Sequence, residues 1–223
     1  MIERIEFVRL MMSSKREKKT LMLVDAFSAS LILFEGIFVI WLMTDKKHLT
    51  AFAARKMCHA GSGGVLMLLN CNFPFSRWFV YSLSVGSLIM NWEVFPSLLP
   101  NFWFGTARDK GITIYLILVS FWVYMGWSLR ILAPVFFADP AGAVVGKWMT
   151  HHFPKDNKKW IGDKTIIGSL AVFLATFISL YKPLATLPRI AVSILATFAE
   201  AIGGSYDNLM IALVVIGTSG VLV

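Results

Sequence analysis

Residues 138–147 read Ala138-Asp139-Pro140-Ala141-Gly142-Ala143-Val144-Val145-Gly146-Lys147. They set an aspartate and a proline between two apolar runs, and a lysine follows the second of two glycines. A charge at membrane depth is costly, so Asp139 is a candidate functional residue. Glycine lets the backbone come close to a ligand. A lysine that follows a glycine-containing turn suits an anion, especially phosphate. The alternative is that Asp139 is buried for structural reasons and pairs with Arg130.

The composition of the whole chain indicates an integral membrane protein. Of its 223 residues, 57% are hydrophobic and only 15% are charged, and the mean hydropathy is +0.69. Long apolar runs recur along the chain, and a spanning helix needs about 20 mostly apolar residues. The chain therefore has room for seven or eight spans. The predicted fold is an all-α, polytopic bundle of seven to eight transmembrane helices.

The sequence divides into two regions. Residues 1–20 are predicted to form a basic amphipathic segment that lies on the membrane surface, with a plain solvated segment as the alternative. Residues 21–223 are predicted to form the transmembrane domain. Its fifth span, at about 131–149, contains Pro134 and Pro140, which predict a kinked or broken helix. Broken helices are tolerated at membrane depth where they line a polar cavity.

The net charge of +8 indicates an anionic partner. On a soluble protein it would suggest nucleic acid, but here the basic residues fall in short loops between apolar runs. Anionic lipid headgroups or a phosphorylated substrate are therefore the expected partners, and no nucleic acid is expected.

Two basic groups stand at predicted helix starts. Arg55, Lys56 and His59 share one helical face at the start of the second span, because residues three and four apart lie on the same side. Such a triad suits a polyanion, although interfacial anchoring is the alternative. The second group, in Gly162-Asp163-Lys164-Thr165-Ile166-Ile167-Gly168-Ser169, opens the sixth span, where the first-turn amides and the helix dipole favour an anion. It lacks the order of a Walker A loop.

These groups are expected on one side of the membrane. With eight spans, the loops after the first, third, fifth and seventh spans share a face, and they carry the basic groups together with Glu200, Asp207 and Asn208. Acids among phosphate-binding cations point to a divalent metal, since one or two carboxylates plus substrate phosphates typically hold Mg²⁺. The combination fits phosphoryl transfer, in which a carboxylate orients the attacking hydroxyl.

Four motifs follow one another in a familiar order. They are Arg55-Lys56-x-x-His59, Asp139-Pro140-Ala141 with Gly146-Lys147, Lys164-Thr165-x-x-Gly168-Ser169, and Glu200-Ala201 with Asp207-Asn208-Leu209. This order, from Arg55 to the C-terminus, resembles the CTP-dependent membrane lipid kinases, among them dolichol kinase, the fungal CTP-dependent diacylglycerol kinase and plant phytol kinase. The resemblance implies that residues 21–223 are a transmembrane catalytic domain. It also implies transfer of the γ-phosphate of CTP to the hydroxyl of a membrane lipid, with Mg²⁺ or another divalent cation.

The resemblance also implies roles for single residues. Asp139 would be the essential acid, and Lys147 and Lys164 would act beside it in catalysis. Asp139, Glu200 and Asp207 would hold the metal. The nucleotide phosphates would be bound by Arg55, Lys56, His59, Gly146, Thr165, Gly168, Ser169 and Asn208. The chain departs from the family pattern at Ile167, where many members have glutamate, and at Gly142, where alanine is commoner. It is shorter than typical dolichol kinases, which favours the compact diacylglycerol or phytol kinase type.

Two other functions fit parts of the pattern. A cytidylyltransferase that makes a CDP-lipid would use the same cations and metal, and a channel or transporter would use polar residues within the membrane. A kinase would be a multi-pass protein whose partners are a lipid alcohol, a nucleoside triphosphate and membrane lipids. In a eukaryotic cell we expect it in the endoplasmic reticulum membrane with the site facing the cytosol. The two faces carry nearly equal numbers of Lys and Arg, so the positive-inside rule does not fix the orientation.

Overall fold

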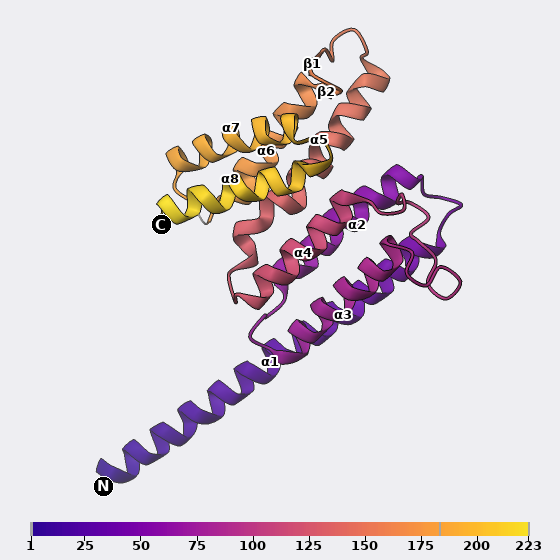
Figure 1. Cartoon of the computed structure of the whole chain (residues 1–223). Helices are drawn as coiled ribbons and strands as arrows, with labels where there is room; N and C mark the ends of the chain where they lie inside the picture. Colours follow the sequence, from indigo (N-terminus) through magenta and orange to yellow (C-terminus); the bar gives the residue numbers. More distant parts are fainter. Residues whose placement is uncertain (1, 183, 223) are drawn as a thin grey trace.

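The chain folds into helices joined by loops of different lengths and by a small hairpin (Figure 1). A computed structural model describes the backbone of residues 2–182 and 184–222 and the side chains of residues 19–20, 22–182 and 184–218. The elements in order are α1 (Ile2–Thr44), α2 (Ala51–Leu68), α3 (Pro74–Asn91), α4 (Lys110–Tyr124), a 3₁₀ turn (Leu129–Leu132), α5 (Ala133–His152), β1 (Lys159–Ile161), β2 (Lys164–Thr165), α6 (Ile166–Ser179), α7 (Thr186–Gly203), a 3₁₀ turn (Gly204–Tyr206) and α8 (Asp207–Leu222). The predicted all-α class is confirmed.

Within the described residues, three stretches are long and apolar enough to cross a membrane. They are Met22–Thr44, Leu129–His152 and Thr186–Thr218, of which the last contains α7 and most of α8. Two shorter apolar helices, α4 and α6, accompany them. Large apolar side chains on the outer surface fit this character, for example Ile178 and Leu187, which are 69% and 77% exposed. These features identify a membrane protein.

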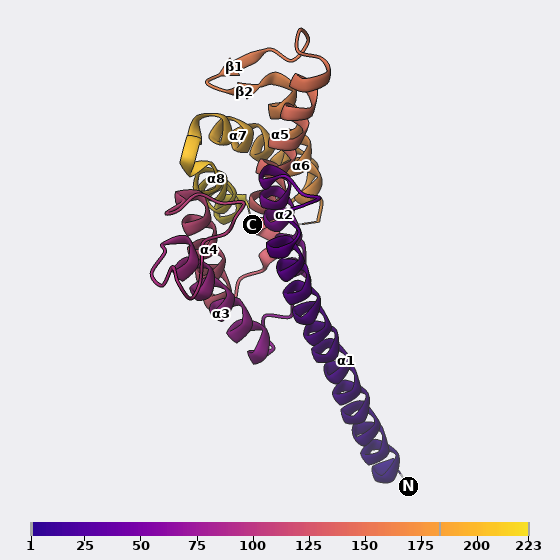
Figure 2. The ribbon, with the colours of Figure 1, turned by 90° about the vertical axis from the view of Figure 1, so that its right-hand side faces the viewer.

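Helix α1 is continuous across the predicted boundary at residue 20. Its N-terminal part projects away from the other helices, as both views show (Figures 1 and 2). Near its other end, Glu35 is buried against the bundle. The apolar face predicted for residues 1–20 depends on side chains that, apart from Lys19 and Thr20, lie outside the described residues.

Local sequence explains where several helices begin. Thr50, Asp109 and Thr165 precede α2, α4 and α6, and each side chain accepts a hydrogen bond from a backbone N–H in the first turn. Such caps satisfy amides that have no partner inside the helix. Pro134 stands in the first turn of α5, where a missing N–H costs nothing. The fifth span was predicted to be kinked or broken, and the break is wrong, because α5 runs uninterrupted from Ala133 to His152 through Pro140.

The helices form two groups that meet at the centre. Helices α1–α4 lie in one group and α5–α8 in the other (Figure 1), and α2 contacts α5 while α4 and α5 both contact α8. The shared core contains Phe136, Leu132, Val123 and Val215, all fully buried. Because α5 packs against helices of both groups, it carries Asp139 into the middle of the molecule.

Helices α5 and α6 approach each other through glycines. A Cβ atom on Gly142 would lie 2.5 Å from Val172 Cγ2 and 3.2 Å from the carbonyl oxygen of Gly168. A Cβ atom on Gly168 would in turn lie 3.0 Å from the carbonyl oxygen of Gly142. Small residues allow this close backbone contact between membrane helices. The contact fixes the start of α6, with Lys164 just before it, against α5.

Candidate functional site

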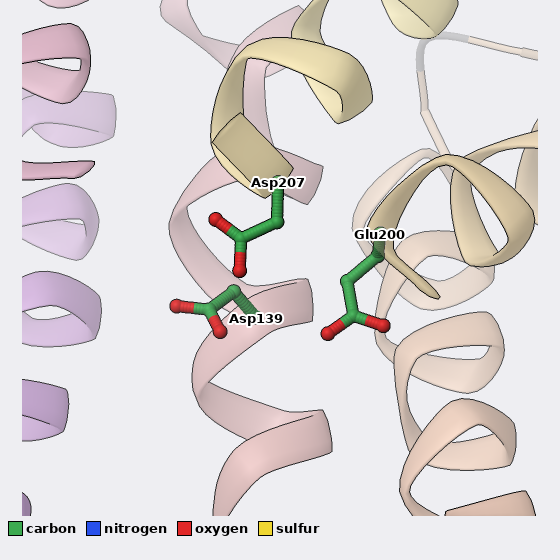
Figure 3. Close-up of side chains that lie close together, drawn as sticks. All are labelled: Asp139, Glu200 and Asp207. Atoms are coloured by element: carbon green, nitrogen blue, oxygen red, sulfur yellow. The ribbon is translucent and has the colours of Figure 1, made fainter. Parts of the chain in front are cut away.

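Three carboxylates from different helices form the centre of the site, which we call the acid cluster. Asp139 lies in α5, Glu200 lies in the last turn of α7, and Asp207 is the first residue of α8. Gly204, with a φ of 55°, makes the tight turn between α7 and α8 that brings Glu200 and Asp207 together. One oxygen from each carboxylate lies within 4.8 Å of the others (Figure 3). Figure 3 shows Asp139 and Asp207 facing each other, with Glu200 beside them.

Lys164 offsets charge on one side of the acid cluster. Its ammonium donates a hydrogen bond to Glu200 Oε1 and lies 3.7 Å from Asp207 Oδ2. Burial disfavours the charged ammonium, but the hydrogen bond and negative charge of Glu200 outweigh it. The pKa of Lys164 is therefore raised above its ordinary value of 10.5. The β1–β2 hairpin holds Lys164 there, because Lys164 pairs with Ile161 at the end of the ladder.

Lys56 offsets charge on the other side of the cluster. Its Nζ atom donates to Asp139 Oδ2 at 2.7 Å, and both side chains are mostly buried, at 15% and 9% exposed. Asp139 therefore pairs with Lys56 of α2 and not with Arg130, so the proposed alternative partner is wrong.

His59 completes this side of the site. Its Nε2 atom lies 3.0 Å from the carbonyl oxygen of Val135, which can only accept, so Nε2 carries the proton. The other nitrogen, Nδ1, faces Asp139 Oδ2 at 3.6 Å, which is too far for a hydrogen bond. The Tyr115 ring packs edge-on against the imidazole, with ring centroids 4.6 Å apart. The imidazole is therefore held with Nδ1 towards Asp139, and in its neutral form the lone pair of Nδ1 faces the carboxylate.

Two cavities flank the acid cluster. The α2–α4 cavity, of about 480 Å³, lies between α2 and the pair α3–α4 and includes Asp139 and Asp207 in its wall. In Figure 2, α3 and α4 lie apart from α1 and α2, and side chains of these helices line this cavity. The α5–α6 cavity, of about 510 Å³, lies beside the hairpin and includes Lys164 and Glu200 in its wall. The acid cluster therefore contributes to the walls of both cavities.

The predicted phosphate-binding residues are divided between these cavities. Four of them line the α2–α4 cavity, namely Arg55, Lys56, His59 and Asn208. The others line the α5–α6 cavity together with Lys147 and Lys164, namely Gly146, Thr165, Gly168 and Ser169. The sequence had suggested one polyanion site, and the structure separates its residues into two groups around the acids.

Several of these residues already have a structural partner. Gly146 and Gly168 lie in the α5–α6 contact, where their Cα atoms are close. The Thr165 hydroxyl caps α6, and the Ser169 hydroxyl accepts a hydrogen bond from Trp160 Nε1 at 2.9 Å. Lys147 is exposed, and its ammonium lies 4.1 Å from the centre of the Phe52 ring. Among these five residues, Lys147 has the side chain that is most free to follow a ligand.

Two residues of the α2–α4 cavity had not been predicted. Asp109 caps α4 and binds Arg55 at 2.7 Å. Burial opposes its ionisation, but the Ile112 amide and the Arg55 guanidinium hold the pKa of Asp109 below its ordinary value. The other residue is Tyr115, whose ring contacts His59. The charged sequence Arg108-Asp109-Lys110 is a local signal that could have indicated Asp109. No local sequence feature marks Tyr115.

The acid cluster fits a divalent cation by its chemistry. All three donors are carboxylate oxygens, the ligands that Mg²⁺ takes, and they come close enough to share one ion. Two of the acids are buried and the third is half-buried, so their charges need a cation nearby. Lys164 and Lys56 supply two positive charges to three acids in the described part of the chain, which leaves net negative charge for a metal.

Comparisons of the chain with models of protein families, with curated proteins and with solved structures find no match.

Proposed function

We propose that this protein is a multi-pass membrane lipid kinase that transfers the γ-phosphate of CTP to the hydroxyl of a membrane lipid with the help of Mg²⁺. The observation that carries the proposal is the position of the acid cluster between two cavities, with Lys56 on one side and Lys164 on the other. Carboxylates for a metal beside cations for phosphates are the parts that phosphoryl transfer needs. The motif order that resembles the CTP-dependent membrane lipid kinases is a second support.

In the proposed arrangement the triphosphate occupies the α5–α6 cavity. Lys147, Lys159 and Lys164 line this cavity and would bind the phosphate oxygens. Lys164 would exchange part of its contact with Glu200 and Asp207 for the γ-phosphate, so that its charge stays matched. The acceptor hydroxyl would approach from the α2–α4 side, next to Asp139.

In the proposed reaction, the acceptor hydroxyl attacks the γ-phosphate. The lipid oxygen forms a bond to the γ-phosphorus, and the bond between that phosphorus and the β–γ bridging oxygen breaks, which releases CDP. Asp139 orients the attacking hydroxyl, and its proton passes to Asp139 or to the lone pair of His59 Nδ1. Glu200 and Asp207, with Asp139, would hold Mg²⁺, which when bound neutralises charge on the transferring phosphate.

We further propose that the chain forms the bundle of seven to eight spans. Helices α1–α8 would all cross the bilayer, with α4 and α6 as its shorter members. The acid cluster would then face the cytosol, where CTP is available. Lys155, in the loop after α5, would be reached from that side. A single-cysteine variant, Lys155→Cys in a Cys58→Ser/Cys71→Ser background, tests this with an impermeant thiol reagent on sealed vesicles.

The test of the activity uses purified protein in lipid nanodiscs. It is incubated with Mg²⁺, each of the four nucleoside triphosphates and a panel of diacylglycerol, phytol and polyprenol, and products are read by mass spectrometry. We expect a lipid phosphate and CDP. Asp139→Asn should lower the rate by about 10²-fold or more, whereas Asp156→Asn, which changes an exposed acid outside both cavities, should leave it unchanged.

Other products would identify the alternative functions. Pyrophosphate and a CDP-lipid from a phosphatidate substrate would indicate a cytidylyltransferase. Ion flux through liposomes without nucleotide, together with no lipid product, would indicate a channel or transporter. Full activity of Asp139→Asn would reject the role given to the acid cluster.

A further inference from the structure

The α2–α4 cavity changes from polar to apolar along its length. At one end it is lined by Lys56, Lys110, Asp139 and Asp207. At the other end it is lined by Leu66 of α2, Val80 of α3 and Val119 of α4, each at most 7% exposed. One end therefore suits a polar, hydrogen-bonding group, and the other suits hydrocarbon.

The length of the cavity follows from helix geometry. Arg55 and Leu66 both line it, and α2 rises about 16 Å between them at ~1.5 Å per residue. This is about half the ~30 Å thickness of a bilayer's hydrocarbon core. The polar end lies at the starts of α2, α4 and α8, and the apolar end lies deeper along α2 and α4. The cavity thus has the depth and the polarity gradient of a site for a lipid whose head is at the acid cluster.

The volume of the α2–α4 cavity limits the size of the lipid that it can accept. About 480 Å³ falls within the range of roughly 300–1,000 Å³ that holds one drug-sized ligand. One hydrocarbon chain with its hydroxyl matches this volume and this elongated shape. A lipid with two long chains would leave one of them outside.

We infer that the α2–α4 cavity binds the acceptor as a single-chain lipid alcohol, with its hydroxyl at Asp139 and Asp207 and its chain against Leu66, Val80 and Val119. The inference deepens the proposed function and rests on it, because that function supplies the reason for a hydroxyl at the acid cluster. It makes Val119 and its neighbours at the apolar end the residues that set chain length.

Photo-crosslinking tests the position of the chain without requiring turnover. The full-length protein in nanodiscs is irradiated with phytol-like and straight-chain alcohols that carry a diazirine at the chain end, and labelled peptides are identified by mass spectrometry. We expect labels on the segments that contain Leu66, Val80 and Val119. Excess unlabelled single-chain alcohol should remove the label, and diacylglycerol at the same concentration should not. Labels confined to outward residues such as Leu33, or equal competition by diacylglycerol, would overturn the inference.

A pair of variants on one helix tests chain length. Val119→Trp fills the apolar end, so the label from the longest alcohols should fall at least tenfold while shorter ones still bind. Ile117→Trp, two residues away and 56% exposed on the outer surface, is the matched control and should behave as the wild type. If Val119→Trp does not fold, Ser84→Leu, a smaller change at another wall position, replaces it. If a folded variant is labelled by long and short alcohols in the same proportions as the wild type, the apolar end does not set the chain length.

The same samples separate this inference from the proposed function. Labels at the apolar end with no phosphorylated product from any nucleotide would reject the kinase and keep the lipid site. A phosphorylated product with labels elsewhere would keep the kinase and reject this site.

Discussion

Lys56 Nζ lies 2.7 Å from Asp139 Oδ2, although the two residues are 83 positions apart in the chain. The pair joins α2 of the first group of helices to α5 of the second, and it is mostly shielded from solvent. Removing one partner of such a pair leaves a buried charge uncompensated, which is far more damaging than removing both. The pair therefore links the two groups of helices, and it also stabilises the charge of Asp139 in the acid cluster.

Lys56→Met should lower stability by about 3–5 kcal/mol, because it leaves Asp139 without its nearest cation. The double variant Lys56→Met/Asp139→Leu should recover most of that loss while remaining inactive. Thermal unfolding in detergent, followed by circular dichroism, measures both effects. The matched control is the exposed pair Lys159–Asp163, with side chains 64% and 97% exposed, where Lys159→Met should change stability by less than about 1 kcal/mol. A double variant as unstable as Lys56→Met would contradict the argument.

Glu200→Gln and Asp207→Asn should each raise the Mg²⁺ concentration needed for half-maximal activity. Changes in the surroundings of a metal ligand already cost about 10–100-fold in affinity, so loss of a ligand should cost at least about tenfold. Titration of phosphorylation rate with Mg²⁺ gives the value, and Asp156→Asn serves as an exposed acidic control. An unaltered Mg²⁺ requirement in both variants would mean that these acids do not hold the ion.

Stability should depend on the charge of Lys164 at high pH. Because the folded state raises the pKa of Lys164, its contribution is fully present below the ordinary value of 10.5 and is lost as pH rises through the higher folded value. The difference in Tm between wild type and Lys164→Met should stay constant from pH 7 to about 10 and shrink above it. Lys158→Met, an exposed change nearby, should show no such pH dependence. A Tm difference that grows above pH 10 would contradict the raised pKa of Lys164 in the folded state.

Gly142→Ala should destabilise the protein by about 1–3 kcal/mol, because the new methyl group would overlap Val172 and crowd the Gly168 carbonyl. Gly86→Ala is the opposite case on another helix, since no atom lies within 4 Å of its new Cβ, and it should stabilise by about 0.5–1 kcal/mol. Both are read from thermal unfolding. Equal effects of the two substitutions would show that the α5–α6 contact is looser than described.

The positions of most helices could be predicted from the sequence, but the exact helix boundaries and the continuity of α5 could not. Apolar runs marked the helices, and the motif around Thr165 marked the start of α6. The starts of α2 after Thr50 and of α4 after Asp109 were found only in the structure. The continuity of α5 through Pro140 was missed, because packing on both sides of α5 supports a helix that local propensity would interrupt.

The sequence by itself determined that this is a helical membrane protein and that Asp139, Lys164, Glu200 and Asp207 are the unusual charges in it. Hydropathy and helix periodicity are local properties, so they can be read along the chain. Only the tertiary structure decided that Asp139 pairs with Lys56 and not with Arg130, that Arg55 pairs with Asp109, and that the basic residues are divided between two cavities. The physical reason is that a charge shielded from water needs a partner within a few ångströms, and which partner it finds depends on how distant helices pack.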